Sequence, residues 1–277
     1  MSLSIADAIR QAEVPDSDTP ELDKEVLLCH VLNKDRAYLF TWPERILEQS
    51  QYDAFSILLE RRNNGEPIAY LTGVREFWSL PLKVHPSTLI PRPDTERLVE
   101  VALELLPNKP TNVVDLGTGT GAIALALASE RPLWSVMGID QSEEAVELAK
   151  DNARINDLDR VAFKVGSWCE GLNPDSVDLM VSNPPYIAET DPHLSQGDVR
   201  FEPLSALVAA QNGLSDIVDI AQQSRVCLRL QGWLIVEHGF EQASDVRQIF
   251  KDCDYRDVTS YQDLSGNDRV TVGCWLG

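Results

Sequence analysis

An Asn-Pro-Pro-Tyr tetrapeptide at residues 183–186 combines groups that can hold a planar nitrogen for chemistry. The Asn183 side-chain oxygen and the Pro184 carbonyl can accept hydrogen bonds, and two prolines fix the backbone. An amide nitrogen is a poor nucleophile, so accepting both of its hydrogens and aiming its lone pair would be the main catalytic device. Asn183, Pro184 and Tyr186 are the candidate catalytic residues, and with Pro185 they form the candidate substrate-binding turn. A rigid turn is the alternative interpretation of this motif.

A glycine-rich run lies earlier in the chain, from Asp115 to Gly121, between a predicted strand and a predicted helix. Glycines let the backbone approach a ligand closely, and the start of a helix offers free N–H groups. The run therefore predicts a nucleotide or nucleoside site whose candidate residues are Gly117, Thr118, Gly119, Thr120 and Gly121. The same geometry serves phosphate loops and dinucleotide sites, but no Lys-Ser or Lys-Thr follows, which argues against a nucleoside triphosphate loop.

Two further residues follow the next predicted strands. Asp140 ends a strand about twenty residues after the glycine turn, where a carboxylate can accept hydrogen bonds from both ribose hydroxyls. That spacing also fits a nicotinamide cofactor, and capping of the helix that follows is the structural alternative. Trp168 follows the third strand and offers a flat face on which an adenine could stack, although most tryptophans are core residues.

The order of these segments indicates methyl transfer. A glycine turn, a ribose carboxylate and an Asn-Pro-Pro-Tyr turn follow successive strands, and Asn183 is expected at the carboxyl edge of the sheet. We therefore expect S-adenosylmethionine as the cofactor, with Tyr186 packing against the acceptor plane and the positive sulfonium. No strong general base is needed, because a methylated amide nitrogen is acidic enough to lose its proton to water. No metal site is predicted.

The surrounding elements suggest a helical module followed by an α/β domain. Residues 4–64 have a helical pattern without a catalytic cluster, and residues 73–93 alternate like a β-hairpin linker. A helix begins at 94–96, and short apolar strands then alternate with helices, which predicts a parallel, doubly wound sheet with a closing antiparallel strand. The predicted strands are Asn112–Asp115, Trp134–Asp140, Val161–Val165, Val177–Ser182, Trp233–Glu237, Tyr255–Ser260 and Arg269–Trp275. The predicted helices are Gly121–Ser129, Ser142–Ile155, Gly213–Leu230 and Gln242–Lys251.

Composition limits the partners and the compartment. The 277 residues carry 44 Asp and Glu against 24 Lys and Arg, a net charge of -20 that repels nucleic acids as a whole. The five cysteines form no Cys-x-x-Cys pair, which predicts reduced thiols that are mostly buried. The first residues lack a signal-peptide pattern, and no apolar run reaches membrane-spanning length. We expect a soluble cytoplasmic protein with no membrane contact, and His238 is interpreted as structural.

The motifs together resemble the HemK/PrmC family of protein-(glutamine-N5) methyltransferases. The resemblance covers most of the chain outside the helical bundle, in residues 73–78, 89–96, 115–121, 183–186 and 193–203. It implies a Rossmann-like S-adenosylmethionine-dependent methyltransferase domain at 94–277, joined by the hairpin at 73–93 to a helical substrate-docking domain at 1–72.

The resemblance also implies the reaction. The acceptor would be the side-chain amide of the glutamine in the Gly-Gly-Gln motif of class 1 peptide chain release factors, with S-adenosylhomocysteine as the other product. Gly117–Gly121, Asp140, Trp168 and Asn183 would contact the cofactor. Three alternatives stay open: a ribosomal-protein glutamine methyltransferase, a nucleic-acid exocyclic-amine methyltransferase, and a silent protein that binds the cofactor or a release factor.

Overall fold

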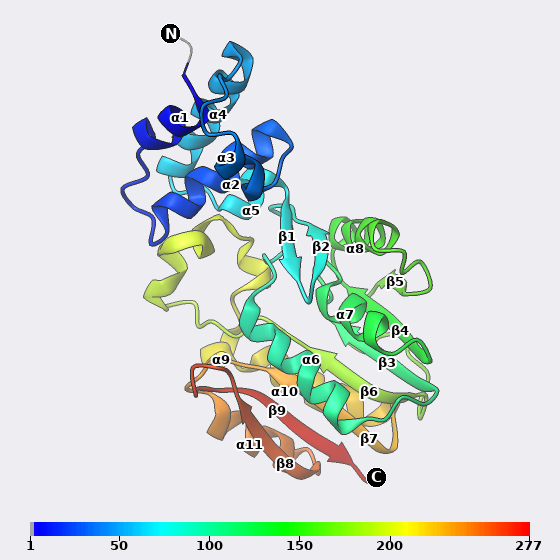
Figure 1. Cartoon of the computed structure of the whole chain (residues 1–277). Helices are drawn as coiled ribbons and strands as arrows, with labels where there is room; N and C mark the ends of the chain where they lie inside the picture. The colour runs from blue at the N-terminus through cyan, green and yellow to red at the C-terminus, as the bar shows by residue number, and fades with distance from the viewer. Residues whose placement is uncertain (1–2) are drawn as a thin grey trace. The chain divides into compact units, whose positions relative to one another are not determined.

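The computed structural model describes residues 3–277, and the chain divides into two compact units. The first, here called the helical unit, runs to Val74 and includes the later segment Ser195–Phe201. The second, the sheet unit, comprises Arg75–Leu194 and Glu202–Gly277. Figure 1 shows the elements of both units.

Five short helices form the helical unit around their own core. Local signals set their starts, since Ser4 and Asp35 accept backbone N–H groups at two helix N-termini and Pro20 opens a third helix. The helices are α1 Ile5–Gln11, α2 Pro20–Leu32, α3 Arg36–Thr41, α4 Gln49–Asn63 and α5 Ile68–Thr72. Their buried core is Ile5, Ala8, Leu27, Leu28, Leu39, Leu47, Phe55 and Leu71.

Ser195–Phe201 packs with the helical unit although it comes more than a hundred residues after α5. Arg62 of α4 makes an ion pair with Asp23 of α2 at 2.7 Å and also lies 3.6 Å from the Asp198 carboxylate. The Arg200 guanidinium fills the space beside Gly65, where a Cβ atom would lie only 1.6 Å from it. This segment contributes the short helix η3 Gly197–Phe201.

A β-hairpin follows α5, as the alternating pattern at 73–93 predicts. Its strands are β1 Val74–Phe77 and β2 Leu80–Lys83, and both turn residues, Trp78 and Ser79, have positive φ, which is the geometry of a tight hairpin turn. The Asn152 side chain of α8 (Glu143–Ile155) accepts from the Lys83 N–H at 2.7 Å. The second strand is thereby fixed against the sheet unit.

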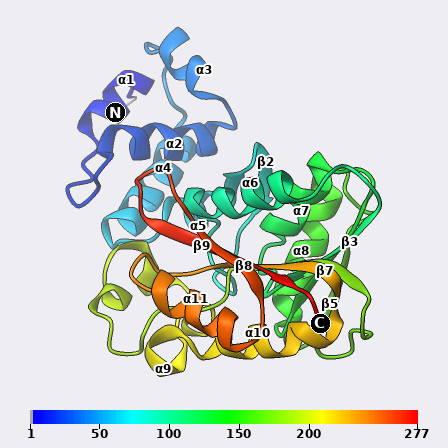
Figure 2. The same cartoon turned by 90° about the horizontal axis from the view of Figure 1, so that it is seen from below.

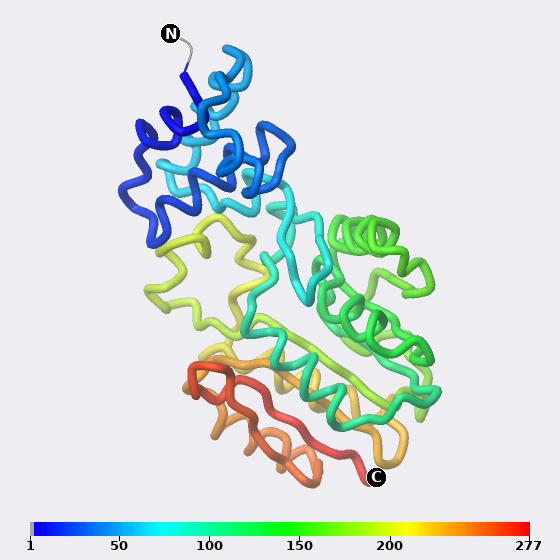
Figure 3. Tube along the Cα trace, viewed as in Figure 1, coloured from blue at the N-terminus to red at the C-terminus, as the bar shows by residue number. Residues whose placement is uncertain are grey.

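The sheet unit contains a seven-stranded sheet in the order β5-β4-β3-β6-β7-β9-β8. The chain starts in the middle at β3, moves outward through β4 and β5, and returns to β6 beside β3, as the trace in Figure 3 shows. β9 runs opposite to the other strands of this sheet and pairs antiparallel with both β7 and β8, which confirms the predicted antiparallel strand. The strands are β3 Thr111–Leu116, β4 Trp134–Asp140, β5 Ala162–Val165, β6 Val177–Ser182, β7 Leu228–Glu237, β8 Arg256–Gln262 and β9 Asp268–Trp275.

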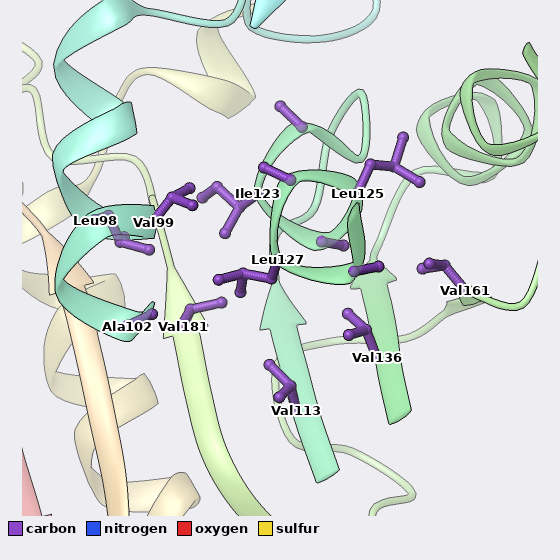
Figure 4. Close-up of a cluster of buried hydrophobic side chains, with 14 of the residues drawn as sticks. Leu98, Val99, Ala102, Val113, Ile123, Leu125, Leu127, Val136, Val161 and Val181 are labelled. Atoms are coloured by element: carbon purple, nitrogen blue, oxygen red, sulfur yellow. The ribbon is translucent and has the colours of Figure 1, made fainter. Parts of the chain in front are cut away.

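Helices cover both faces of this sheet. α6, α7 and α8 lie on one face, and α10 and α11 on the other, as the view in Figure 2 shows. Figure 4 shows the first of these cores, where Leu98 of α6 and Leu127 of α7 meet Val181 of β6. The helices are α6 Glu96–Leu105, α7 Ala122–Glu130, α8 Glu143–Ile155, α9 Ala210–Gly213, α10 Ser215–Cys227 and α11 Ala243–Asp252, with short turns η1 Pro93–Thr95, η2 Pro192–Ser195 and η4 Leu204–Ala206.

One predicted element was wrong at its end. The expected helix at 213–230 stops at Cys227, and Leu228 already pairs with Val177 as the first residue of β7. A bulge then separates this pair from the regular pairing that resumes at Trp233, which is why the sequence pattern marks only the second half of the strand.

All five cysteines are free, and all but Cys29 are buried. Within residues 3–277, no helix has the length and apolar character needed to cross a membrane.

Candidate active site

The chain adds strands to one side of β3 and then, from β6 onward, to the other side. The ends of β3 and β6 lie side by side at this switch point. Ligands in open α/β sheets bind at this kind of position, outside the carboxyl ends of the strands. Leu116 and Ser182, the last residues of the two strands, are paired in register, and the Ser182 hydroxyl donates to the Leu116 carbonyl at 2.7 Å. Gly117 therefore directly follows the end of β3, and Asn183 directly follows the end of the neighbouring strand β6.

The glycine turn needs its glycines for backbone shape and for packing. Gly117, Gly119 and Gly121 all have positive φ, between 53° and 83°. A Cβ atom on Gly121 would lie 3.1 Å from the Ala149 Cβ, so this glycine lets α7 pack closely against α8. A Cβ atom on Gly119 would meet nothing within 4 Å, so that part of the turn faces open space.

The Asp115 side chain holds the glycine turn in place through hydrogen bonds. Its Oδ2 accepts a hydrogen bond from the Thr118 hydroxyl at 2.6 Å and another from the Ala124 N–H at 3.2 Å. Burial raises the pKa of this carboxyl to about 7, while the bonds from Thr118 and Ala124 act in the opposite direction. The side chain joins the end of β3 to the first turn of α7, which fixes the shape of the glycine run.

Asp140 connects the glycine turn with the next helix. Its Oδ2 accepts from the Gly119 N–H at 2.9 Å, and its Oδ1 accepts from the Ser142 N–H, also at 2.9 Å. Each oxygen keeps a further lone pair for a ligand hydroxyl. The capping role and the predicted ribose role are thus compatible in this geometry.

Trp168 lies beside Gly117, the first glycine of the turn. Its φ of 44° is rare for a large side chain, and its half-buried ring lies 3.4 Å from the position of a Cβ atom on Gly117. The ring lines the same cavity as Asp140 and the glycine turn. Its predicted stacking on an adenine stays a prediction.

Asn183 presents its two amide atoms to different partners. Its Nδ2 donates to the Thr95 hydroxyl at 3.2 Å, whereas its Oδ1 has no hydrogen-bond partner among residues 3–277. Asn183 and Thr95 both line the cavity. Asn183 therefore brings an amide oxygen with free acceptor capacity to the lining of this cavity.

One cavity collects most of the predicted site residues. Its lining includes Gly117, Thr118, Gly119, Thr120, Asp140, Trp168, Asn183 and Pro185. Gly121, Pro184 and Tyr186 do not line it: Gly121 packs between helices, Pro184 is buried, and Tyr186 turns its hydroxyl toward Glu237 at 3.4 Å. The Gln242 side chain donates to the Tyr186 carbonyl at 3.0 Å and so holds the end of the turn.

Glu237 is a buried carboxyl behind the Asn-Pro-Pro-Tyr turn, at the carboxyl end of β7. The Tyr186 hydroxyl donates to its Oε1 at 3.4 Å, whereas its buried Oε2 has no hydrogen-bond partner among residues 3–277. Burial raises the pKa of Glu237 to about 7, against the lowering effects of Thr95, Arg269 and Tyr186, and Asp94 raises it further. Burial likewise raises the pKa of the Tyr186 phenol.

Sequence reasoning missed Thr95 and Glu237. Thr95 was part of a predicted helix start, and Glu237 was the last residue of a predicted strand. The available signal was the position of Glu237, because a carboxyl at the end of a buried strand lies at the edge where ligands bind. Nothing in the spacing shows that Thr95 reaches Asn183. His238, by contrast, is structural as predicted, with its Nε2 2.8 Å from the Thr271 hydroxyl.

Known proteins share this fold and this chain organisation. Residues 107–266 match a family described as a methyltransferase domain, and residues 5–73 match the PrmC N-terminal domain family. The crystal structure of a methyltransferase from Pyrococcus furiosus superposes with a TM-score of 0.56 at 16% identity, covering 80% of this chain and 100% of that one. The Rossmann-like domain of this chain is a methyltransferase domain.

Full-length relatives define the family more narrowly. The release factor glutamine methyltransferase of Aliivibrio fischeri is 56% identical over 100% of this chain and 99% of its own length. The enzyme of the same name from Escherichia coli is 51% identical over 97% of this chain and 96% of its own. The chain belongs to the release factor glutamine methyltransferase family.

Proposed function

We propose that this protein transfers a methyl group from S-adenosylmethionine to the side-chain amide nitrogen of the glutamine in the Gly-Gly-Gln motif of class 1 peptide chain release factors. The observation that carries the chemistry is that Asn183 lines the cavity next to the glycine turn and that its Oδ1 has no hydrogen-bond partner among residues 3–277. The choice of acceptor is supported by relatives of about 50% identity that are named for release factor glutamine methylation.

The residues around the cavity fit this cofactor. Gly119 leaves open space, Asp140 keeps lone pairs for two ribose hydroxyls, and Trp168 offers a half-buried aromatic face for the adenine. S-adenosylmethionine supplies an electrophilic methyl group on a positively charged sulfur. The protein's task is to hold the acceptor nitrogen in line with that methyl group.

Asn183 and Pro184 orient the acceptor. The Asn183 Oδ1 and the Pro184 carbonyl each accept one hydrogen of the glutamine amide, which turns the nitrogen lone pair toward the methyl carbon. Held by Gly119, Asp140 and Trp168, S-adenosylmethionine would supply the methyl group to this nitrogen and would keep the electron pair of its sulfur–carbon bond on sulfur. The nitrogen then loses one proton to water, so no side chain has to act as a strong base.

Tyr186 is proposed to support this geometry rather than to carry charge. Its hydroxyl reaches Glu237 and its carbonyl is held by Gln242, so both ends of the residue are tied to the elements behind the turn. The predicted packing of its ring against the acceptor plane stays a prediction. With Pro185, it completes the proposed binding turn for the glutamine.

The helical unit is the proposed docking module for the release factor, which acts in the cytoplasm. The match of residues 5–73 to the PrmC N-terminal domain family supports a role specific to this family. The net charge of -20 favours a protein acceptor over a nucleic acid.

The test is direct labelling of the acceptor. The protein is incubated with methyl-labelled S-adenosylmethionine and an unmodified release factor, and the label is mapped by mass spectrometry. The control is the same factor with its Gly-Gly-Gln glutamine replaced by alanine. Label on that glutamine alone supports the proposal. Label on a ribosomal protein or a nucleic acid instead would keep the methyltransferase and overturn the acceptor.

A further inference from the structure

We propose that Gln242 is a positioning residue that sets the place of the Pro184 carbonyl, one of the two groups proposed to accept hydrogens of the glutamine amide. The inference rests on the proposed function, because that function gives the Pro184 carbonyl this role. Gln242 is the residue directly before α11 and does not line the cavity. It acts on methyl transfer through the Tyr186 carbonyl, to which its Nε2 donates at 3.0 Å.

The two prolines limit how the Asn-Pro-Pro-Tyr turn can be held. Neither Pro184 nor Pro185 has an N–H group, so the protein cannot fix these residues by accepting hydrogen bonds from them. Under the proposed function the Pro184 carbonyl also has to stay open for the acceptor. The hydrogen bonds that hold the turn are therefore expected at its two ends, at β6 before Asn183 and around Tyr186.

The residue after the turn is fixed by backbone pairing. Ile187 forms an isolated parallel bridge with Val208. Its N–H donates to the Leu207 carbonyl at 2.9 Å, and its own carbonyl accepts from the Ala209 N–H at 3.0 Å. These bonds hold Ile187, and a separate side chain holds the carbonyl of the residue before it.

Gln242 is that side chain, and both ends of its amide are occupied. Its Nε2 donates to the Tyr186 carbonyl at 3.0 Å and to the Asn212 carbonyl at 3.1 Å. Its Oε1 accepts from the Gly239 N–H at 2.8 Å. The flipped amide would place its oxygen against two carbonyl oxygens and its NH2 group against an N–H. The surrounding backbone therefore fixes the orientation of this amide.

The Asn212 carbonyl belongs to a strained piece of backbone. Gln211, Asn212 and Gly213 have φ of 55°, 58° and 84°. Left-handed backbone is unfavourable for residues that carry a Cβ atom, and it persists where surrounding contacts hold it. A Cβ atom on Gly213 would lie only 2.1 Å from the Tyr186 carbonyl oxygen. Gln242 thus bridges two backbone segments that meet without room for a side chain.

Few rotatable bonds separate the Tyr186 carbonyl from the Pro184 carbonyl. The ring of Pro185 fixes φ of the residue between them. Methyl transfer needs the acceptor nitrogen in a narrow range of positions, and a misplacement of about 1 Å can cost on the order of a hundredfold in rate. Releasing the Tyr186 carbonyl from Gln242 lets the Pro184 carbonyl shift, and the acceptor amide loses its orientation.

Gln242→Glu separates this role from support of the α11 start. Glutamate keeps the oxygen that accepts from Gly239 but removes both donated bonds, and a carboxylate is favourable near a helix N-terminus. The matched control is Asn156→Asp. The Asn156 Nδ2 also donates to two backbone carbonyls, those of Pro81 at 3.0 Å and Asn152 at 2.9 Å, and none of these residues lines the cavity. Both substitutions add one negative charge.

The first measurement reads the Tyr186 carbonyl without any acceptor. The sequence Tyr-Ile occurs once in the chain, at 186–187. Protein labelled with ¹³C at its tyrosine carbonyls and ¹⁵N in its isoleucines therefore gives one assigned signal for this peptide by nuclear magnetic resonance. The carbonyl shift should change in Gln242→Glu and stay unchanged in Asn156→Asp. An unchanged shift in Gln242→Glu would overturn the proposal.

The second measurement is single-turnover methyl transfer at saturating cofactor and release factor. Gln242→Glu should be about tenfold to a hundredfold slower than the unsubstituted protein, with the cofactor Kd unchanged. Gln242→Ala should also be slower, and Asn156→Asp should keep the full rate. Thermal unfolding checks that each variant is folded at the assay temperature. A role confined to the start of α11 predicts a full rate in Gln242→Glu, and that result would sink the proposal.

The outcomes separate this inference from the proposed function. If label goes to an acceptor other than the release factor, the proposed acceptor is wrong, and the same variants are compared on the acceptor that is labelled. A deficit confined to the Gln242 variants then supports the positioning role. If the release factor is methylated at equal rates by Gln242→Glu, Asn156→Asp and the unsubstituted protein, the positioning role is wrong and the function stands.

Discussion

The hydroxyl of Ser182 donates a 2.7 Å hydrogen bond to the carbonyl of Leu116, and this bond joins the last residues of β6 and β3. Both residues are fully buried. The candidate acceptor residue Asn183 follows one of them, and the first glycine of the cofactor turn follows the other. A single side chain thus ties the two halves of the proposed site together.

Replacing Ser182 with alanine should weaken both stability and transfer. The Leu116 carbonyl loses a buried partner, which costs on the order of 1–3 kcal/mol in unfolding free energy. Ser224→Ala is the control, because it also removes a buried hydroxyl, from α10. Chemical denaturation should show losses in both variants. The transfer rate should fall only in Ser182→Ala, and an equal rate loss in the control would show that destabilisation alone is responsible.

Asn183→Ala should abolish most transfer while cofactor binding partly remains. The substitution removes the acceptor proposed to orient the glutamine nitrogen, and a preorganised group of this kind is worth about 10²–10³ in rate. Calorimetric cofactor titration and single-turnover rates would separate the two effects. Asn112→Ala, at the other end of β3, is the control. A parallel loss of affinity and rate would make Asn183 a cofactor residue only.

Asp140→Ala should weaken cofactor affinity with less effect on turnover at saturation. It removes the carboxylate proposed for the ribose and also the acceptor for the Gly119 N–H, so a rise in Kd of about tenfold to a hundredfold is expected. Asp178→Ala removes a carboxylate at the start of β6, distant along the strand from the site, and serves as the comparison. An unchanged Kd in Asp140→Ala would remove the ribose assignment.

Substitutions at two glycines with nearly equal backbone φ angles would test how the Asn-Pro-Pro-Tyr turn is held in place. Gly213 and Gly266 have φ of 84° and 83°, but a Cβ atom on Gly213 would lie 2.1 Å from the Tyr186 carbonyl oxygen, whereas one on Gly266 meets nothing within 4 Å. Gly266→Ala should therefore cost about 1 kcal/mol of backbone strain. Gly213→Ala should cost more and also slow transfer, as measured by thermal unfolding and single-turnover rates. Similar losses in both variants would contradict the close approach.

The raised pKa of Glu237 predicts a specific pH dependence of stability. The folded protein holds this proton up to about pH 7, whereas an unperturbed glutamate has a pKa of 4.5. The contribution of Glu237 to the free energy of unfolding is fully present below its pKa in the unfolded chain. It is lost as the pH rises through its pKa in the folded protein. The free energy of unfolding of Glu237→Gln minus that of the unsubstituted protein should therefore be larger at pH 8 than at pH 5. The expected increase is on the order of 1–3 kcal/mol.

Denaturant titrations of both proteins at the two pH values measure this difference. Glu144→Gln, on the exposed side of α8, makes the same substitution away from the site and serves as the comparison. A difference of the opposite sign would mean that Glu237 is ionised more easily in the folded protein than in the unfolded chain.

The sequence predicted those parts of the site that are set by local backbone. The positive φ of the glycine turn, the strand before Asn183 and the carboxylate at the end of β4 are encoded within a few residues each. The start of β7 at Leu228 could not be predicted in this way. Its pairing with Val177 is a contact between distant segments, and a bulge interrupts the regular pattern.

The roles of the side chains behind the Asn-Pro-Pro-Tyr turn could not be predicted from the sequence either. Whether Tyr186 lines a cavity or turns away depends on where Glu237 lies, and the two are 51 residues apart. Thr95 comes 88 residues before Asn183, so their hydrogen bond exists only because η1 and the end of β6 meet in the folded sheet unit. Spacing along the chain carries no record of such a contact.

The grouping of Ser195–Phe201 with the helical unit means that the backbone passes between the two units three times rather than once. A deletion of the first 73 residues would leave this excursion without Arg62 of α4 and without the turn at Gly65, which it contacts, and would not yield a clean catalytic fragment. Only eight residues separate Tyr186 from Ser195, so the peptide that forms the acceptor turn continues almost directly into the proposed docking module. Under the proposed function, capture of the protein substrate and presentation of its glutamine would both fall to one continuous stretch of polypeptide.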